Sequence, residues 1–479
     1  MPQSLSPERP PSPPGGGAIP SIIAVIDVGK TNAKVVLVDG ASGAELGSRT
    51  ALTEVRQDGV YPHLDAARLW EFFSGALSEL NRSHPVSAIA VTAHGAAGAF
   101  LSADPNADGL ALPILDYEFA GPDEVAEEYD AVRPGFDETL SPRLPKGLNL
   151  GAQIFWQEKR FPEAIQRSAA YVNYPQYWAW RLTASAATEM CSMGAHTDLW
   201  NPRSLGWSSL VTRMGWDRVF APLRPAFDRL GPLKPELARR LGLALEIPVV
   251  CGIHDSSAAL LPHVIAREPP FTVVSTGTWT ILFAVGGSLD RLDSRRDALA
   301  NVTAFGKPLP CARFMGGREF EILAGRDPKE PNEEELTCVL TDMVLALPSF
   351  VPNVGPFPDC LGRWTHRPET LQPGERAGAA SLYLALMTAE SMSCADAQGQ
   401  TIVEGPFAAN SVFCAALAAI TGRAVLPSSG GSGTSRGAAC LFNPERGFPA
   451  ADERPAAPLL HQAFAAYVER WRDLAGRPE

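Results

Sequence analysis

The sequence has few cysteines, and no two of them lie close together. The eight cysteines, among them Cys191, Cys251, Cys311 and Cys440, are scattered over 479 residues, and none forms a CxxC pair. In a chain of this length, that pattern argues against a disulfide scaffold and against a zinc site built on paired cysteines. We therefore expect reduced, mostly buried thiols.

Long apolar runs and an excess of basic residues are also absent. No apolar run reaches the roughly 18 residues that a membrane span requires. The formal net charge of −12 argues against a general affinity for nucleic acid or for an anionic membrane. The start, MPQSLSPERPPSPPGGG, has no apolar core, so we expect residues 1–20 to form a disordered tail rather than a signal peptide. Together these features predict a cytoplasmic protein.

The length and composition favour two large globular domains. A chain of 479 residues with 45% hydrophobic and 20% charged residues exceeds the size of one ordinary domain. Regular structure should break at the EPP segment, between Pro262 and Pro270. We therefore predict one domain over residues 21–266 and a second over residues 267–479.

Two similar β-hairpins are predicted, one near the start of the chain and one near its middle. SIIAVIDVGK and KVVLVDG are β-branched runs joined by a polar turn with Gly29, Lys30, Thr31 and Asn32. FTVVSTGTWTILFAVGG repeats the pattern around Gly277. A repeat at this position is expected if both halves share one core. Duplicated halves, each opening with a hairpin whose glycine turn faces a shared cleft, are the plan of the α/β actin-like ATPase fold.

Helical periodicity is clearest between Asp65 and Arg82, where Asp65 suits the N-cap. The segment from about Asp123 to Arg240 is predicted to be mostly helical. In the second half, helices are expected near 375–393 and in NSVFCAALAAITG, alternating with the strands TIVEG and RAVLP.

The glycine turns of both hairpins are candidate phosphate sites. A glycine at a hairpin tip lets backbone N–H groups approach phosphate oxygens, because no Cβ intervenes. An ordinary structural turn is the alternative for either hairpin taken alone. The candidate phosphate ligands are Gly29, Lys30, Thr31 and Asn32 in the first turn and Thr276, Gly277 and Thr278 in the second. Asp27, at the end of a strand, could support Mg²⁺.

Asp255 is the candidate catalytic base. In CGIHDSSAALL it stands where a buried strand ends and a helix begins, so capping of that helix is the alternative role. Phosphoryl transfer needs alignment, a metal and a positioned carboxylate more than covalent chemistry. Asp255 could therefore accept the proton of an attacking hydroxyl and share the metal with Asp27.

Other polar residues near strand ends are candidates for sugar and nucleoside contacts. The sugar-side candidates are His94, Gly95, Asp116, His254 and Asp255. The alternative for His94 is a structural role, with its hydrogen bonds made within the protein. The adenosine-side candidates are Gly405 and Asn410, with Gly431, Gly433 and Thr434 from the glycine-rich turn before the last helices.

Over nearly its full length after the tail, the chain resembles the FGGY carbohydrate kinases. AVIDVGKTNAKVVLVD resembles the first phosphate motif of this family, CGIHDSSAALLP its catalytic GxxD segment, and VVSTGTW its second phosphate motif. The resemblance implies two ribonuclease-H-like domains around a central cleft, with sugar held mainly by the first and ATP by the second. It also implies Mg²⁺, a small-molecule sugar or polyol substrate, and the option of a homodimer.

Three departures from the family pattern stand out. Lys30 occupies a position where the family usually has threonine. EGPFAAN, from Glu404 to Asn410, replaces a glycine-rich adenosine motif and keeps only Gly405. The turn around His94 lacks the larger polar residues that some members use to read the sugar. The overall pattern is more similar to rhamnulokinases and fuculokinases than to glycerol kinase.

The sequence thus predicts an ATP-dependent kinase that phosphorylates a hydroxyl of a ketose, related sugar or polyol, with Asp255 as the base. One alternative is a degenerate sugar- or nucleotide-binding sensor of the same fold. Another is an actin-like ATPase acting on protein partners, although the chain has no appended peptide-binding β-domain. The sequence names neither the sugar nor the hydroxyl.

Overall fold

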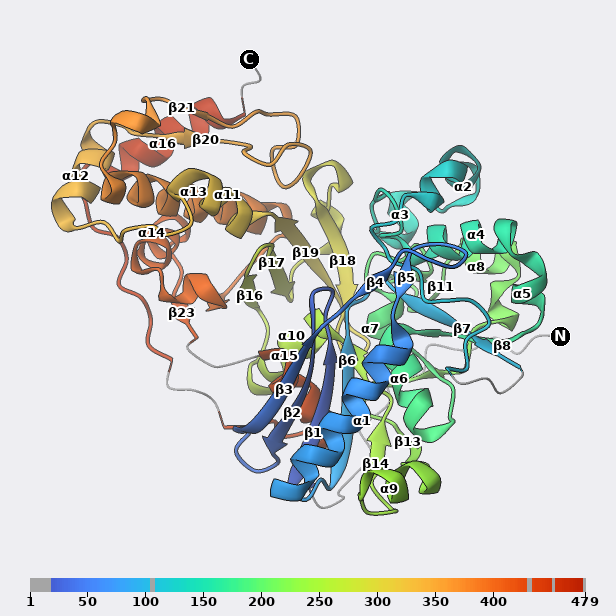
Figure 1. The fold of residues 1–479 in the computed structure, drawn as a ribbon. Coiled ribbons are helices and arrows are strands. Elements are labelled where there is room, and N and C mark those ends of the chain that lie inside the picture. The colour runs from blue at the N-terminus through green and yellow to red at the C-terminus, as the bar shows by residue number, and fades with distance from the viewer. Residues whose placement is uncertain (1–18, 104–107, 429–432, 450–452, 477–479) are drawn as a thin grey trace. The chain divides into compact units, whose positions relative to one another are not determined.

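The computed structural model describes residues 19–103, 108–428, 433–449 and 453–476. The chain divides into two compact units (Figure 1). Unit 1 comprises residues up to Ala266 together with Ala300–Pro308 and Ser432–Pro449, and unit 2 comprises the remainder. Two segments beyond residue 266 therefore fold with the first half of the chain, whereas a single cut at that residue would assign them to the second.

Unit 1 is built on a mixed sheet in the order β13-β14-β6-β1-β2-β3, with β15 also paired to β6. Strands β1 and β2 form the predicted first hairpin, and β1 runs parallel to β6. The strands are β1 Ile22–Val28, β2 Asn32–Asp39, β3 Glu45–Leu52, β6 Ala88–Ala93, β13 Arg229–Pro232, β14 Pro248–Val250 and β15 Ile253–His254.

The side chains of β1 alternate between the two faces of the sheet, and helices cover both faces. Ala24, Ile26 and Val28 pack with residues of α1, α6 and α9 in one core cluster. Ile23 and Val25 pack with α10 and α15 in a second cluster on the opposite face. Because side chains alternate between the faces of a strand, a continuous apolar run such as IIAVIDV is expected where helices cover both faces.

Some helices of unit 1 cover the sheet, and others lie in residues 108–228, between β7 (Gly98–Ser102) and β13, which we call the inserted region. They are α1 Ala66–Ser83, α2 Ala126–Val132, α3 Phe136–Thr139, α4 Leu150–Arg160, α5 Pro162–Gln166, α6 Tyr174–Thr183, α7 Met190–Met193, α8 Ser209–Met214, α9 Pro235–Leu241, α10 Asp255–Ala266 and α15 Gly433–Ala439. Short 3₁₀ helices are η1 Gly121–Val125, η2 Trp216–Arg218 and η7 Cys440–Phe442.

Helix α1 confirms the helix predicted from Asp65, because the Asp65 carboxylate caps it by accepting from Arg68 N. The prediction that residues 123–240 are mostly helical is wrong in part, since short strands interrupt the helices there. The minor strands of unit 1 are β4 Val55–Arg56, β5 His63–Leu64, β7 Gly98–Ser102, β8 Ser168–Asn173, β9 Thr188–Glu189, β10 Trp200–Asn201, β11 Gly206–Trp207 and β12 Leu223–Arg224.

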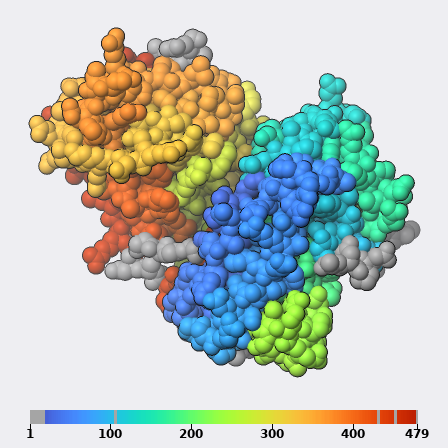
Figure 2. Space-filling view, viewed as in Figure 1, coloured from blue at the N-terminus to red at the C-terminus, as the bar shows by residue number. Residues whose placement is uncertain are grey.

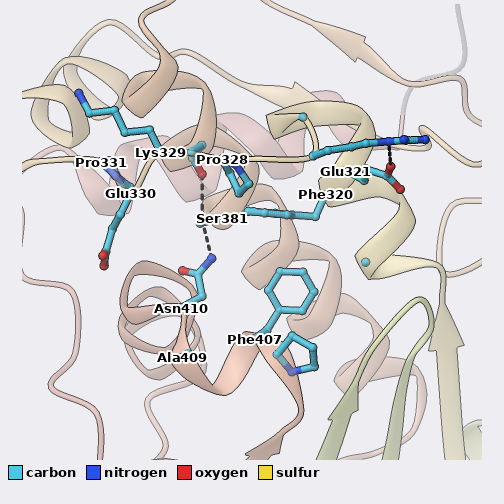
Figure 3. Close-up of a pocket in the computed structure, with 15 residues that line it drawn as sticks. Phe320, Glu321, Pro328, Lys329, Glu330, Pro331, Ser381, Phe407, Ala409 and Asn410 are labelled. Carbon is cyan, nitrogen blue, oxygen red and sulfur yellow. Dashed lines mark hydrogen bonds and ion pairs between the residues drawn. The ribbon is translucent and has the colours of Figure 1, made fainter.

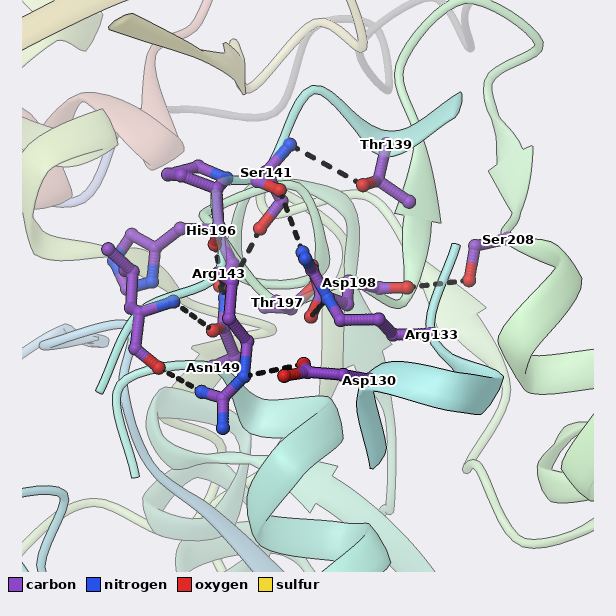
Figure 4. Close-up of polar contacts among 12 residues, drawn as sticks. Asp130, Arg133, Thr139, Ser141, Arg143, Asn149, His196, Thr197, Asp198 and Ser208 are labelled. Carbon is purple, nitrogen blue, oxygen red and sulfur yellow. Dashed lines mark hydrogen bonds and ion pairs between the residues drawn. The ribbon is translucent and has the colours of Figure 1, made fainter. Parts of the chain in front are cut away.

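A buried ionic network stabilises the inserted region of unit 1 (Figure 4). Asp198, only 1% exposed, accepts hydrogen bonds from Arg133 Nε at 3.1 Å, Arg133 Nη2 at 2.9 Å and Tyr129 Oη at 2.7 Å. The backbone of Asp198 has a φ of 65°, a left-handed conformation that aspartate tolerates better than most residues. Nearby, the Asn149 amide donates to His196 O at 2.8 Å. Asp198, in the loop after α7, thus binds Tyr129 of α2 and Arg133, which follows that helix.

Unit 2 repeats the plan of unit 1. Its sheet has the order β18-β19-β17-β16-β22-β23, and the β16–β17 pair is the predicted second hairpin. As in unit 1, the first hairpin strand pairs antiparallel with the second and parallel with a later strand. The strands are β16 Phe271–Thr276, β17 Thr280–Val285, β18 Ala298–Val302, β19 Pro308–Phe314, β22 Gln400–Glu404 and β23 Val425–Pro427, with a separate pair, β20 Ala346–Leu347 and β21 Arg363–Trp364. The division into units falls within β18 and β19, since Ala300–Val302 and Pro308 are counted with unit 1.

The core of unit 2 lies between this sheet and a layer of helices, in which the long α13 is mostly buried. In Figure 2 the yellow and orange segments that include this layer form much of the visible surface of the unit. The helices are α11 Gly316–Ala324, α12 Glu333–Thr341, α13 Pro373–Cys394, α14 Ser411–Thr421 and α16 Phe464–Ala475, with 3₁₀ turns η3 Leu289–Arg291, η4 Ser294–Arg296, η5 Pro368–Thr370 and η6 Pro406–Ala409. The predicted helix near 375–393 and the helix–strand alternation after it are confirmed.

A buried carboxyl group in α11 makes the stability of unit 2 depend on pH. Glu319 accepts backbone hydrogen bonds from Phe350 N at 2.9 Å and Val351 N at 3.1 Å. Its other carboxyl oxygen is buried, and the buried hydroxyl of Tyr383 interacts with the carboxyl group. Burial raises the pKa of Glu319 to about 7 from its ordinary value of 4.5. The folded state therefore keeps this proton over a pH range in which the unfolded chain has lost it.

We predict that this group lowers stability as pH rises from 4.5 to about 7. The loss should total about 3 kcal/mol, because the unfolded state ionises first. Glu319→Gln retains the acceptor oxygen and should remove this slope, making the variant more stable than the wild type at pH 8. Thermal unfolding from pH 4.5 to 8 measures the slope. Glu321→Gln is the control on the same helix, because Glu321 is only partly buried and pairs with Arg318 and Arg326. An unchanged slope in Glu319→Gln would contradict the assignment.

Candidate active site

The turn of the first hairpin carries donors that the fold leaves free. Gly29 N donates to Asn32 O at 2.9 Å and closes the turn, while Thr53 N donates to Thr31 O at 2.9 Å and supports it. Among the described residues, no partner is recorded for the backbone N–H of Lys30 or Thr31. The side chains of Thr31 and Asn32 are exposed. This turn can therefore offer N–H and hydroxyl donors to an anion.

Asp27 and Asp255 form a pair of carboxylates in unit 1. Asp27, near the end of β1, accepts a hydrogen bond from Ser435 Oγ of α15 at 3.3 Å. Burial, with the nearby charge of Asp255, raises the pKa of Asp27 to about 6. A divalent cation would relieve this repulsion, and oxygen ligands suit Mg²⁺. No group of three or more potential metal-ligating side chains occurs in the described parts of the chain, so these two carboxylates would leave positions for water or phosphate oxygens.

Asp255 is the first residue of α10, and its carboxylate is held on one side by His254. The distance from His254 Nε2 to Asp255 Oδ1 is 3.1 Å, and Ser256 N donates to the same oxygen at 2.6 Å. Burial by itself would raise the pKa of Asp255, but the hydrogen bond and charge of His254 outweigh it and hold that pKa at about 2. The carboxylate is ionised at neutral pH and its side chain is 29% exposed, so it can accept a proton from a ligand.

Gly95 allows the imidazole of His254 to lie close to the backbone at the end of β6. A Cβ at position 95 would stand 2.9 Å from His254 Nε2. The opposite ring nitrogen, Nδ1, is buried without a partner among the described residues. Gly95, which was predicted to lie on the sugar side, thus leaves space for His254, and His254 orients Asp255.

His94 lies near His254 and Asp116, and it packs against two tyrosines. The His94 ring lies 5.4 Å from Tyr117 and 4.9 Å from Tyr174, measured between centroids. Neither His94 nitrogen has a partner among the described residues. Burial lowers the pKa of His94 to about 4, and the charges of Asp255, Lys30, His254 and Asp116 all act on it. His94 is therefore a neutral, unpaired donor and acceptor within reach of these groups.

Tyr117 and Tyr174 were missed as site residues in the sequence. Tyr117 could have been found from its place beside Asp116, but the link between Tyr174 and His94 joins residues 80 positions apart and leaves no local pattern. Ser435 was also missed, because its contact with Asp27 spans most of the chain.

In unit 2, the turn of the second hairpin adjoins the segment around Gly405. The Thr276 hydroxyl donates to Glu404 O and accepts from Phe407 N at 3.1 Å. Arg318 N lies 3.4 Å from Thr278 O, and a Cβ at Gly317 would stand 2.1 Å from Gly277 O. The Thr276 hydroxyl thus links β16 to the backbone of residues 404–407, whereas the side chain of Thr278 is exposed.

Next to this turn, unit 2 holds a cavity of about 500 Å³ (Figure 3). Phe320 and Phe407 pack edge to face in its wall, with centroids 5.0 Å apart. Asn410 lines the cavity, but its amide is engaged, donating to Ser381 Oγ at 2.9 Å and accepting from Phe413 N at 2.9 Å. Several charged side chains stand at the lining: Glu321, Arg326, Lys329 and Glu330. The cavity combines an apolar wall with polar groups, as small-ligand sites commonly do.

The predicted adenosine-side residues that the structure describes are divided between the two units. Gly405 and Asn410 belong to unit 2, where Asn410 lines the cavity. Gly433 and Thr434 begin α15 in unit 1. Gly431 lies outside the described residues.

Gly405 is fixed by close contact as well as by backbone conformation. Its φ is +81°, and a Cβ there would stand 1.9 Å from Thr276 O. We predict that Gly405→Ala destabilises the protein by about 2–5 kcal/mol, because backbone strain and a backbone clash add. Gly422→Ala is the matched control in the same unit, since Gly422 has a φ of +65° and a Cβ added there would meet no atom within 4 Å. Equal thermal shifts in the two variants would mean that the clash with Thr276 is relieved at little cost.

The comparison with protein families matches both halves of the chain. The N-terminal domain of the FGGY family of carbohydrate kinases matches residues 22–262. The C-terminal domain of carbohydrate kinase FGGY matches residues 268–450. The relatives include L-fuculokinase of Salmonella typhi, 26% identical over 285 residues, or 56% of this chain and 57% of that protein. A rhamnulokinase of Halalkalibacterium halodurans is 23% identical over 132 residues, covering 27% of each chain. The chain thus spans little more than half the length of the curated L-fuculokinase and less of the rhamnulokinase.

Solved structures extend the similarity over nearly the whole chain. A carbohydrate kinase from Novosphingobium aromaticivorans is 35% identical, with a TM-score of 0.87, and the match covers 95% of this chain and 99% of that one. A xylulose kinase from Brucella ovis, 16% identical with a TM-score of 0.75 over 95% of this chain and 98% of that one, shares the fold. The predicted actin-like, two-domain α/β fold is confirmed, and the chain belongs to the FGGY family of carbohydrate kinases.

Proposed function

We propose that this protein is an ATP-dependent carbohydrate kinase that transfers the γ-phosphate to a hydroxyl of a ketose or a related sugar or polyol. The observation that carries the proposal is the ionised carboxylate of Asp255, oriented by His254 in the same unit as the unpaired donors of the first hairpin turn.

Among the described residues, no helix is both long and apolar enough to cross a membrane.

Asp255 acts as the general base in this proposal. Its carboxylate accepts the proton of the sugar hydroxyl as that oxygen forms a bond to the γ-phosphorus. The bond from the γ-phosphorus to the β,γ-bridging oxygen breaks, and ADP leaves with the bridging oxygen. With a pKa of about 2, Asp255 is a weak base, so proton transfer should accompany or follow the P–O bond changes rather than precede them.

The phosphate-binding proposal rests on the two hairpin turns. In unit 1, Thr31 offers its backbone N–H and its hydroxyl, and Asn32 offers its side-chain amide, while the Gly29 N–H closes the turn. In unit 2, Gly277 and Thr278 offer backbone and side-chain donors beside the cavity, while Thr276 holds the neighbouring backbone. Mg²⁺, when bound, would neutralise charge on the transferring phosphate. Asp27 and Asp255 are the residues that we propose to hold it, directly or through water.

The cavity of unit 2 is the proposed adenosine site. Its aromatic wall, from Phe320 and Phe407, suits a flat heteroaromatic base. Because the amide of Asn410 is already engaged, we expect Asn410 to shape the site rather than to read the base. Gly405 belongs to the same proposal, since it lets the backbone turn tightly beside Thr276.

On the sugar side, we propose that His94, Asp116, His254 and Asp255 receive the hydroxyls, with Tyr117 and Tyr174 as aromatic walls. The two unpaired nitrogens of buried His94 support a polar ligand there, because such groups are costly when unsatisfied. The relatives named L-fuculokinase and rhamnulokinase make ketoses the first substrates to test.

An ADP-release assay with Mg·ATP tests the proposal across L-fuculose, L-rhamnulose, D-xylulose, glycerol and D-gluconate, following the acceptors in the names of relatives and structural neighbours. We expect sugar-dependent ADP release, strongest with a ketose. ATP binding without release for any acceptor would favour a sensor of the same fold. Absence of ATP binding would contradict the kinase.

A further inference from the structure

Lys30 lies in the turn of the first hairpin, and its ammonium group contacts a different segment of unit 1. It forms ion pairs with Asp116 and with Glu118, the latter with an N–O distance of 3.4 Å. The ammonium also lies 4.6 Å from the centroid of the Tyr117 ring. All these residues belong to unit 1. The cation is therefore engaged with the segment 116–118.

Asp116 has one carboxyl oxygen engaged and one without a recorded partner. Oδ1 accepts from Lys30 Nζ and from Glu118 N, the latter at 3.3 Å. No partner is recorded for Oδ2 among the described residues, although the Asp116 side chain is only 8% exposed. The backbone is fixed at the same residue, since Asp116 N donates to Pro62 O at 3.1 Å. A mostly buried carboxyl group paired with Lys30 thus keeps one oxygen for a ligand.

Tyr117 connects this pair to the base. Its ring packs edge to face with His94, with centroids 5.4 Å apart, and the Lys30 ammonium lies over the ring. The charge of Asp255 also acts on Tyr117, whose pKa is raised to about 12, mainly by burial. The pair formed by Lys30 and Asp116 therefore borders the same group of residues that contains His94 and Asp255.

We propose that Lys30 is a positioning residue of the acceptor site rather than a phosphate ligand. It holds Asp116 so that Oδ2 accepts a hydrogen bond from a sugar hydroxyl, and it balances the charge that would otherwise be buried. This inference rests on the proposed kinase activity. Lys30, Asp116 and Glu118 together carry one net negative charge, so the site selects an uncharged sugar and disfavours an acidic one such as gluconate.

Lys30→Met and Lys30→Arg test the proposal. Methionine keeps much of the length and apolar bulk of lysine but removes the charge. We expect Lys30→Met to raise KM for the preferred sugar of the panel by about tenfold or more, because a charge-assisted contact to Asp116 is lost. Binding of AMP-PNP, a non-hydrolysable ATP analogue, should stay within about twofold of the wild type by calorimetry. Lys30→Arg should recover most of the sugar affinity, since it restores the cation.

Lys159→Met is the matched control. Lys159 is also a lysine of unit 1, paired with Glu128 and lying 5.4 Å from the Phe155 ring, but it lies outside the site. It should change neither KM nor AMP-PNP binding.

Two results would overturn the proposal. The first is AMP-PNP binding weakened about tenfold or more in Lys30→Met, as expected for loss of a phosphate ligand. The second is an unchanged sugar KM in Lys30→Met. Failure of the kinase proposal itself is recognised separately, because the wild type would then release no ADP with any acceptor. In that case AMP-PNP binding still decides whether Lys30 contacts phosphate.

Discussion

Asp255→Asn should lower kcat by about 10²- to 10⁴-fold, the range expected for loss of a general base. Asparagine has nearly the shape of aspartate but cannot take up the proton of a sugar hydroxyl. The exposed part of the carboxylate and the His254 contact on Oδ1 leave a face of Asp255 available for that proton. AMP-PNP binding, measured by calorimetry, should change much less than kcat, because the nucleoside contacts are proposed to lie in unit 2.

Asp65→Asn is the control for this substitution. Asp65 caps α1 by accepting from Arg68 N at 3.0 Å, and asparagine caps a helix about as well as aspartate. The control should keep full activity and stability. If Asp255 merely capped α10, Asp255→Asn would also keep full activity, and a kcat near the wild-type value would remove Asp255 from the mechanism.

Asp198→Ala should destabilise the protein by about 3–5 kcal/mol, because it leaves the Arg133 guanidinium without its carboxylate partner. The substitution also removes the acceptor for Tyr129 Oη and places alanine at a φ of 65°. Thermal and urea unfolding of the whole chain would show the loss as a lower first midpoint, since the two units need not unfold together.

Two variants separate the contributions at this network. Asp198→Asn tolerates positive φ but replaces one accepting oxygen with a donor, so it removes the charge and at least one hydrogen bond without the backbone strain of alanine. Tyr129→Phe removes one hydrogen bond and should cost about 1 kcal/mol. If Asp198→Ala destabilised no more than Tyr129→Phe, the ion pair with Arg133 would contribute little to the fold.

Much of the fold could be predicted from local sequence. The runs IIAVIDV and FTVVST are apolar on both faces, and each is followed by a glycine turn and a second run, so each predicts a buried hairpin. The cap at Asp65 is a local contact across three residues and was equally predictable. The segment 123–240 was harder, because its strands are two to six residues long and, except for the β10–β11 pair, bind distant segments.

The site could be predicted only in part, for a related reason. Asp255 and the glycine turns lie in short motifs that a sequence displays directly. The pairing of Lys30 with Asp116 joins positions 86 residues apart, and the contact of Ser435 with Asp27 spans 408. Only the folded β1–β2 turn and α15 bring these side chains to their partners. The unpaired nitrogens of His94 likewise become visible only once its surroundings are known.

The most direct test of the central claim is the ADP-release assay with Mg·ATP and the acceptor panel, run in parallel on the wild type and Asp255→Asn. The account predicts release that depends on an uncharged sugar, is strongest with a ketose, and is nearly lost in the variant. Sugar-dependent release that persists unchanged in Asp255→Asn would contradict the role of Asp255. A wild type that binds neither ATP nor any acceptor would contradict the kinase itself.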